Sequence, residues 1–360
     1  MYNQNNNNQG NSNQNRYTDL NMKHCLTKEG SSYVGVTVKS VVTRPNQPRT
    51  YGDRRVIDFT MPINGRGKYI ETMCEKAPYG KDGTVWAKVS FWQDANAADG
   101  PVSRLDRLFS QTQGKGVVLV VTGSIRVEES EGKDGRVFVN TNITGDDFCV
   151  VSPTEEKPNA RYSFMNMKRC VGKNGNPYIG VTAEVAVFET DRRDTPSGRS
   201  VINFNTSLRG RSKYIETMCG MTPYTNDKGV TRVRGAFWED ANVERSTPAS
   251  RLEHMLQKNP DKNFVLCVTG AIKVEQRKDD QGNVFVDTKI SCDDFTVVRS
   301  FAKQQANGYD QSGQQKKSAP QGTDDGQQNQ GYGRPEQESI PSGLNNDFYD
   351  IEDDDDELPF

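Results

Sequence analysis

The sequence is poor in histidine and lacks the cysteine spacing typical of zinc sites. Its only histidines are His24 and His254, and its seven cysteines never occur as Cys-x-x-Cys. Structural zinc sites are built from four Cys or His ligands, usually in closely spaced pairs. We therefore expect no metal and no cofactor, and cysteines that are reduced thiols buried in strands or lying on the surface.

Long apolar runs are missing as well. No segment approaches the roughly 18 consecutive apolar residues that a membrane span requires. The first residues contain no basic stretch followed by an apolar one, as a secretory signal would. We therefore expect a cytoplasmic protein with no membrane contact.

Motifs that mark common nucleic-acid enzymes are also absent. The sequence contains no phosphate-binding loop of the Gly-x-x-x-x-Gly-Lys-Ser/Thr type, no His-Glu-x-x-His and no His-Cys-Cys metal set. The acidic doublets Asp146-Asp147 and Asp293-Asp294 could be metal ligands of a nuclease, but they open a strand, where solvated turn acids are common. We therefore expect that the protein is not an enzyme.

Charge is distributed unevenly along the chain. The formal net charge is −2, from 46 basic and 48 acidic residues. Eight of the acids lie between Asp347 and Glu357, where no basic residue occurs, so the rest of the chain holds 46 basic against 40 acidic residues. A mildly basic body joined to an acidic tip predicts a polyanionic partner for the body and a different partner for the tip.

The chain is an internal duplication. Lys68–Cys74 recurs unchanged as Lys213–Cys219 at an offset of 145 residues, and Asp146–Phe148 returns as Asp293–Phe295 at an offset of 147. Two one-residue insertions account for the drift. A period this long exceeds that of solenoid repeats, so each copy should be a domain.

Within the first copy, the apolar pattern predicts strands and one helix. Ile57, Phe59 and Met61 alternate with polar residues, as half-buried strands do. Residues 102–111 carry apolar side chains at helical spacing between the third and fourth predicted strands. Five strands with a helix at this place are the elements of an OB-type β-barrel, so we expect an all-β fold with minor α, made of two tandem five-stranded OB barrels.

The sequence therefore divides into six parts. These are a disordered Asn/Gln-rich arm (1–19), a first OB fold (20–152), a linker (153–163), a second OB fold (164–300), a disordered polar segment (301–346) and an acidic partner-binding tip (347–360). The two segments predicted to be disordered contain too few large apolar residues to offset the entropy lost on folding.

The third predicted strand carries the strongest binding signal. If Val85, Ala87, Val89 and Phe91 point into the core, then the alternate residues Trp86, Lys88 and Trp92 point to solvent. Tryptophans beside a lysine form a surface on which bases stack and a phosphate is neutralised. The second copy places Arg232, Arg234 and Trp238 on the same face. Packing of the tryptophans at a barrel end or subunit contact is the alternative.

Two further sets of residues are candidates for DNA contact. A basic and aromatic cluster is expected in the loop after the second predicted strand, and Phe138 and Phe285 are expected on the last strand of each copy. The alternative is packing within a loop. The cluster comprises Arg66, Lys68 and Tyr69 in the first copy and Arg211, Lys213 and Tyr214 in the second.

On these residues the chain resembles the bacterial single-stranded DNA-binding protein family. The Trp86 to Trp92 spacing is similar to the family's aromatic pair, and Thr195–Gly198 followed by Val201–Phe204 is similar to its entry into the second strand. The ending resembles the family's acidic tip, which closes in an apolar residue, Pro and Phe. Here its residues are Asp353, Asp354, Asp355, Asp356, Glu357, Leu358, Pro359 and Phe360.

The sequence also departs from the family pattern. Arg232 stands where the family has its first strand-three aromatic, and Ser130 and Arg277 replace the aromatic expected before the last turn. Near Gly67 and Ser212, the expected stacking aromatic is likewise absent. Guanidinium planes stack on bases, so binding is expected to survive, but affinity and site size do not carry over.

The resemblance implies sequence-independent binding and protection of single-stranded DNA during replication, recombination and repair. It implies a nucleoid-associated homodimer with four barrels, whose acidic tip recruits replication, recombination and repair enzymes. An RNA-binding OB-fold protein is the alternative, since base stacking tolerates either sugar.

Overall fold

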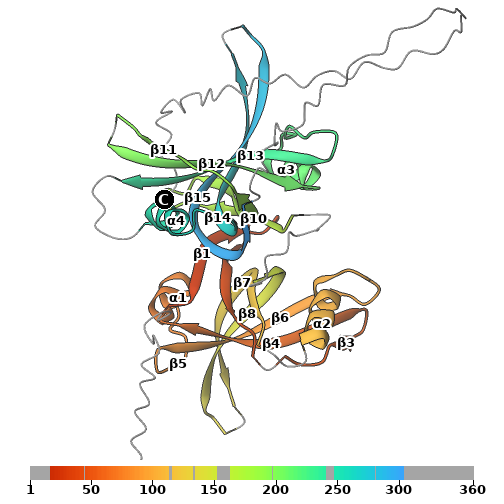
Figure 1. Ribbon diagram of the computed structural model, residues 1–360. Helices are drawn as coiled ribbons and strands as arrows, with labels where there is room; N and C mark the ends of the chain where they lie inside the picture. The colour runs from red at the N-terminus through yellow and green to blue at the C-terminus, as the bar shows by residue number, and fades with distance from the viewer. Residues whose placement is uncertain are drawn as a thin grey trace, which may run out of the picture. The chain divides into compact units, whose positions relative to one another are not determined.

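The computed structural model describes residues 17–43, 45–112, 116–132, 134–151, 163–196, 198–240, 247–279 and 281–303. These residues form mainly β-strands, with four α-helices among them (Figure 1). None of these helices has the length and apolar content of a membrane-spanning segment. The predicted arm before residue 17, nearly all of the linker 153–163, and residues 304–360 with the acidic tip lie outside the described residues.

The two copies of the repeat fold into the same succession of elements. The first copy contains β1 (Asp19–Leu26), β2 (Ser32–Val41), β3 (Arg49–Tyr51), β4 (Arg54–Asn64), α1 (Gly67–Cys74), β5 (Gly80–Lys81), β6 (Thr84–Asp94), α2 (Pro101–Thr112), β7 (Val118–Glu131) and β8 (Val137–Val150). The second contains β9 (Met165–Val171), β10 (Pro177–Val187), β11 (Asp191–Asp194), β12 (Arg199–Arg209), α3 (Ser212–Cys219), β13 (Val230–Asp240), α4 (Pro248–Lys258), β14 (Lys262–Lys278) and β15 (Val284–Ala302).

The strands of each copy pair in one order. In the first copy β2 pairs with β7, β7 with β8, β8 with β6 in parallel, and β6 with β4. The second copy repeats this order with β10, β14, β15, β13 and β12. The helix predicted over 102–111 is confirmed as α2, which lies between β6 and β7 in the sequence.

The sheet is not closed into a barrel by a ladder. In the described part of the first copy, Ser40 of β2 donates a 2.6 Å hydrogen bond to the carbonyl of Pro62. Beyond the end of β2, Thr43 forms an isolated bridge with Thr60 of β4, and the Asn46 N–H donates to the carbonyl of Asp58 at 2.9 Å. Pro45 and Pro48 follow Thr43, and proline has no N–H to extend the ladder. The mostly β fold with minor α is therefore confirmed, whereas two closed barrels go further than the pairing shows.

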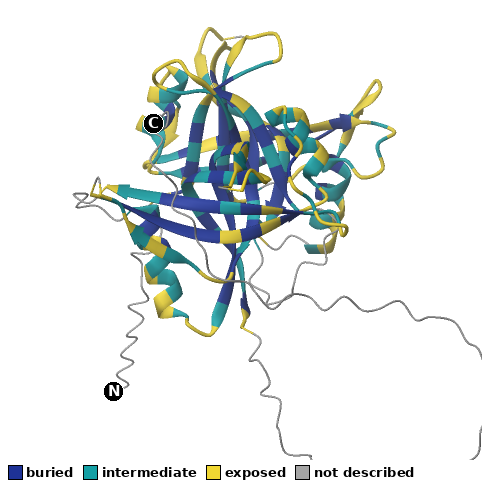
Figure 2. Ribbon diagram, turned by 90° about the horizontal axis from the view of Figure 1, so that it is seen from above, coloured by how far each residue is buried: buried dark blue, intermediate teal, exposed yellow. Residues whose placement is uncertain are grey.

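Each copy buries its own apolar core. The alternating residues of β4 and β6 and the inner side of α2 fill the first core, around Phe59, Phe91 and Leu105. The corresponding residues of β12, β13 and α4 fill the second, around Phe204, Phe237 and Leu252. Figure 2 shows the buried residues concentrated along the strands and the exposed ones at the turns.

A third apolar cluster joins the two copies. Val120 and Cys149 of the first copy pack there with five residues of the second, namely Phe164, Val265, Cys267, Val298 and Phe301. β1 also pairs with β9, so the sheet runs from one copy into the other. Contacts within residues 17–303 are dense enough that both copies belong to one structural unit, and the predicted domain boundaries stay a prediction.

The two cores fill the same space with different residues. In the first copy Val89 lies on β6, and Gly145 of β8 lies opposite Phe91, whose ring fills the space that a side chain at Gly145 would take. In the second copy Gly235 occupies the place of Val89 and Cys292 that of Gly145. The ring of Phe204 covers Gly235. In each copy the glycine leaves room for a neighbouring aromatic ring, as close packing requires.

This packing predicts that Gly145→Ala destabilises the first copy. The new Cβ would overlap the ring of Phe91, and overpacking of this kind costs about 1–3 kcal/mol. Urea unfolding should show this loss. Gly67→Ala is the matched control, because its Cβ would lie 3.8 Å from the nearest atom, on Val85. Equal stability of wild type and Gly145→Ala would contradict the packing described.

Candidate nucleic-acid interface

The outward face of β6 carries exposed aromatic and basic side chains. Val85, Ala87, Val89 and Phe91 are buried, and the alternate residues Trp86 and Trp92 are 52% and 37% exposed. The Lys88 side chain between them is exposed as well. The predicted orientation of this strand is therefore confirmed. Because β4 and β8 pair with β6 on its two sides, the three side chains are held on a fixed surface.

A short hairpin adds residues to this face that the sequence analysis missed. The guanidinium of Arg54 lies 5.1 Å from the centre of the Trp92 ring, and the ring of Tyr51 lies 6.1 Å from it. Arg49 lies 5.7 Å from the centre of the Tyr51 ring. All three come from β3 and the start of β4, which are joined by a turn at Gly52 with a positive φ of 59°. They extend the basic and aromatic surface beyond Trp92.

One acid is buried within this face. The alternation of β4 predicts that Asp58 points to solvent, but only 4% of it is exposed. β3 folds over it, so that its carboxylate accepts a hydrogen bond from Arg49 and another, of 2.6 Å, from the Ser90 hydroxyl. Lys88 lies 4.0 Å away. Burying a carboxylate is costly unless it is paired, and here two cations and a hydroxyl pair it. The face therefore stays basic around the acid.

The second copy has the same face with different chemistry. Arg232 is exposed, and Arg234 and Trp238 are half-buried on the outward side of β13, as predicted. Arg199 lies 5.1 Å from the centre of the Trp238 ring, as Arg54 does over Trp92. Asn203 replaces Asp58, since it pairs with Ala236 where Asp58 pairs with Ser90. This face thus has two arginines and one tryptophan, where the first has two tryptophans and a lysine.

The predicted loop after the second long strand is a helix in both copies. Arg66 precedes α1 and its Nε donates a 2.8 Å hydrogen bond to the carbonyl of Thr18. The Tyr69 hydroxyl accepts from the Met22 N–H at 3.1 Å and donates to the Met22 carbonyl at 3.2 Å. Burial raises the pKa of Tyr69 above its ordinary value. These bonds fasten α1 to β1 and engage the hydroxyl of Tyr69, whose predicted contact with DNA stays a prediction.

The second cluster repeats this arrangement. Tyr214 makes the same pair of hydrogen bonds to Met167, and Arg211 donates to the carbonyl of Ser163. Lys68 and Lys213 are exposed on their helices, each 3.1 Å from a glutamate three residues later. The lysines thus remain accessible to a phosphate, whereas the tyrosine hydroxyls are engaged.

Phe138 and Phe285 lie on the two long hairpins, β7–β8 and β14–β15, which project from their copies (Figure 1). They are 50% and 52% exposed. Ser130 and Arg277 are their partners across the ladder, and Phe138 also covers Gly132. Val137 and Val284 beside them are exposed apolar residues that the sequence analysis did not single out. Each hairpin therefore presents an apolar and aromatic arm.

Comparisons with known proteins add little to this geometry. No family model and no curated protein matches the sequence. Two solved structures of the single-stranded DNA binding protein from Thermus aquaticus are similar to the chain at 12% identity over 73% of its length. One is a deletion mutant, of which 93% is covered with a TM-score of 0.20, and the other is the wild type, covered over 91% with a TM-score of 0.18. Scores this low carry no argument.

The anchoring of α1 predicts how Tyr69→Phe behaves. The change removes only the hydroxyl, and therefore the two hydrogen bonds to Met22, at a cost of about 0.5–1.5 kcal/mol each. Thermal unfolding should show a lower midpoint, while affinity for an oligonucleotide should stay the same. A loss of affinity at unchanged stability would instead assign the hydroxyl to ligand contact.

Proposed function

We propose that the chain binds single-stranded DNA without sequence preference, through the outward faces of β6 and β13 on two tandem OB-type barrels. The observation that carries this proposal is the β6 face, where the exposed Trp86 and Trp92 flank Lys88. Large aromatic rings are usually covered, so exposed rings held on a rigid strand beside cations need a partner with flat apolar surfaces and negative charge. A single nucleic-acid strand offers both.

The chemistry of the face favours unpaired bases. Stacking on an aromatic ring contributes about 1–3 kcal/mol per base and requires that the face of the base be accessible, which a duplex prevents. Every base has such a face, so binding is tolerant of sequence. Lys88, Arg232 and Arg234 neutralise phosphates, and their release of counterions drives much of the affinity. Arg232 also stacks on a base in place of the tryptophan it replaces.

The proposed cellular role is the one implied by the resemblance of the sequence to bacterial single-stranded DNA-binding proteins. The chain covers single strands during replication, recombination and repair in the cytoplasm, associated with the nucleoid, and performs no catalysis itself. Two chains form a homodimer that presents four barrels. Support for two barrels acting as a unit comes from the apolar cluster and the β1–β9 pairing that already join the two copies.

The acidic segment 347–360 recruits other proteins. Its acids repel DNA, whereas Leu358, Pro359 and Phe360 offer an apolar end beside dense negative charge. Such a peptide fits a hydrophobic pocket rimmed by arginine and lysine on a replication, recombination or repair enzyme. The polar residues 304–346, which follow the last strand, give it reach while the barrels stay on DNA.

Replacement of the face tryptophans tests the DNA proposal. Trp92→Ala and Trp238→Ala should each weaken binding to oligothymidylate by about fivefold to 150-fold, the equivalent of the roughly 1–3 kcal/mol of one stacked base. Trp92→Phe is the matched control, since it keeps a ring and should retain most of the affinity. Affinity is measured by fluorescence anisotropy of a labelled oligonucleotide.

Thermal unfolding of the same variants separates binding from packing. Unchanged affinity with a lower midpoint would place the tryptophans in a packing contact and overturn the proposal. Competition with the RNA oligonucleotide of the same sequence decides the alternative, because equal or tighter RNA binding would favour an RNA-binding protein.

Replacement of the last residue tests partner recruitment. Phe360→Ala should remove most binding of replication and repair enzymes in a pull-down, because it deletes the apolar plug and leaves every charge in place. Deletion of 347–360 should leave DNA affinity equal or slightly higher, most clearly at low salt, where the acids compete best for the basic faces. Recovery of the same partners by wild type and Phe360→Ala would contradict the proposal.

A further inference from the structure

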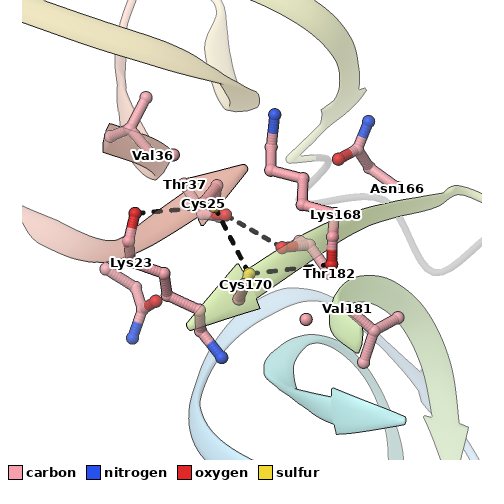
Figure 3. Close-up of a pocket in the computed structure, with 12 residues that line it drawn as sticks. Lys23, Cys25, Val36, Thr37, Asn166, Lys168, Cys170, Val181 and Thr182 are labelled. Atoms are coloured by element: carbon pink, nitrogen blue, oxygen red, sulfur yellow. Dashed lines mark hydrogen bonds between the residues drawn. The ribbon is translucent and has the colours of Figure 1, made fainter. Parts of the chain in front are cut away.

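The two copies meet at a pair of thiols that are equivalent in the repeat. Cys25 of β1 and Cys170 of β9 lie opposite each other in the antiparallel pairing that joins the copies. Their sulfur atoms are 3.3 Å apart, and both residues are only 1% exposed (Figure 3). Thr37 and Thr182, also equivalent in the repeat, share a 2.9 Å hydrogen bond beside them. Local two-fold symmetry therefore brings each thiol to its own counterpart.

Backbone geometry permits a bond between these sulfurs. Opposed residues in an antiparallel pair have Cα atoms about 4.5–5.5 Å apart, within the range of about 4.4–6.8 Å found for disulfides. Glycine leaves the room that the sulfurs occupy. A Cβ at Gly35 would lie 2.7 Å from the Cys25 sulfur, and one at Gly180 would lie 2.6 Å from the Cys170 sulfur.

The hydrogen bond between the two thiols and the nearby Lys23 lower the pKa of Cys170. Lys23 and Lys168 line the same small cavity, and each also forms an ion pair across the junction, with Asp293 and Asp146 respectively. The hydrogen bond from the Cys25 thiol lowers the pKa of Cys170 to about 7, with help from Lys23 and against the effect of burial. The same hydrogen bond and burial raise the pKa of Cys25. The two thiols therefore differ, since Cys170 loses its proton more readily than an ordinary cysteine and Cys25 less readily.

We propose that Cys25 and Cys170 are a peroxide-responsive dithiol, whose oxidation to a disulfide covalently joins the two copies of the chain. This modification does not depend on the proposed DNA binding, because neither cysteine lies on β6 or β13. It fixes the β1–β9 junction that otherwise depends on non-covalent contacts.

The reaction needs only hydrogen peroxide as oxidant. The thiolate attacks one peroxide oxygen, the O–O bond breaks, and the departing hydroxide takes up a proton to leave as water, which gives a sulfenic acid. The second thiol attacks this sulfur, the S–O bond breaks, and the hydroxyl leaves as water with the proton of the thiol. The two sulfurs lose two electrons in total, and the peroxide gains them.

The cavity selects a small oxidant. Its volume is about 20 Å³, and a cavity needs roughly 10–15 Å³ to hold one water molecule. Hydrogen peroxide is only slightly larger than water, whereas a peptide disulfide such as oxidised glutathione would have to open the junction first. A second pair of neighbouring thiols, Cys149 and Cys267, lies in the apolar cluster between the copies, where their hydrogen bond and burial raise the pKa of Cys149. Its reactivity toward peroxide can be compared with that of Cys25 and Cys170 in the same molecule.

The test is oxidation of the full-length protein by one equivalent of hydrogen peroxide. After denaturation, alkylation and digestion, mass spectrometry should find a peptide that joins Cys25 to Cys170, and the count of free thiols should fall from seven to five. Dithiothreitol should restore all seven. The oxidised protein should unfold at a midpoint several degrees higher, because the bond closes a long loop in the unfolded chain.

Variants isolate the pair. Cys25→Ser, which is close to isosteric, should lose both the cross-link and the shift in midpoint. Cys74→Ser, which removes a half-buried thiol on α1, should keep both. The cross-link is read directly in the wild type, so poor folding of a variant leaves the test intact. Oxidation that joins Cys149 to Cys267 first, or that stops at unlinked cysteines, would overturn the proposal, as would a cross-link without a shift in midpoint.

Discussion

The alternation of buried and exposed residues along β6 and β13 is the constraint on which the rest of the structure depends. Each strand sends alternate residues into a core and the others to solvent, so a slip of one residue would bury Trp92 and expose Phe91. The register is held from both sides, by β4 and β8 in the first copy and by β12 and β15 in the second. The core therefore fixes the position of the outward aromatic and basic residues on these strands.

Duplication has let the copies diverge under this constraint. In the cores, Gly235 and Cys292 stand where the first copy has Val89 and Gly145, and the strands keep the same pairing. The outward faces are not bound by close packing and differ more freely, with two tryptophans and a buried acid in one copy and two arginines and an asparagine in the other. The first face therefore carries more exposed aromatic surface, and the second carries more basic side chains.

Local patterns account for what the sequence predicted well. Alternation of apolar residues with period two determines strand orientation, and the spacing over 102–111 determines α2. The short α1 was missed because eight residues beginning with glycine give little helical signal. The burial of Asp58 and the place of Arg54 and Tyr51 depend on β3 folding back over the sheet. The thiol pair depends on contact between residues 145 positions apart, which no local pattern encodes.

The most direct measurement of the central claim is tryptophan fluorescence during titration with oligothymidylate. The sequence has three tryptophans, and Trp86, Trp92 and Trp238 all lie on the two strand faces, so the whole signal reports on the proposed surface. Stacking of bases predicts strong, saturable quenching, with much weaker quenching by a duplex of the same length. Saturable binding of the single strand, seen by anisotropy, without a change in tryptophan fluorescence would contradict the account.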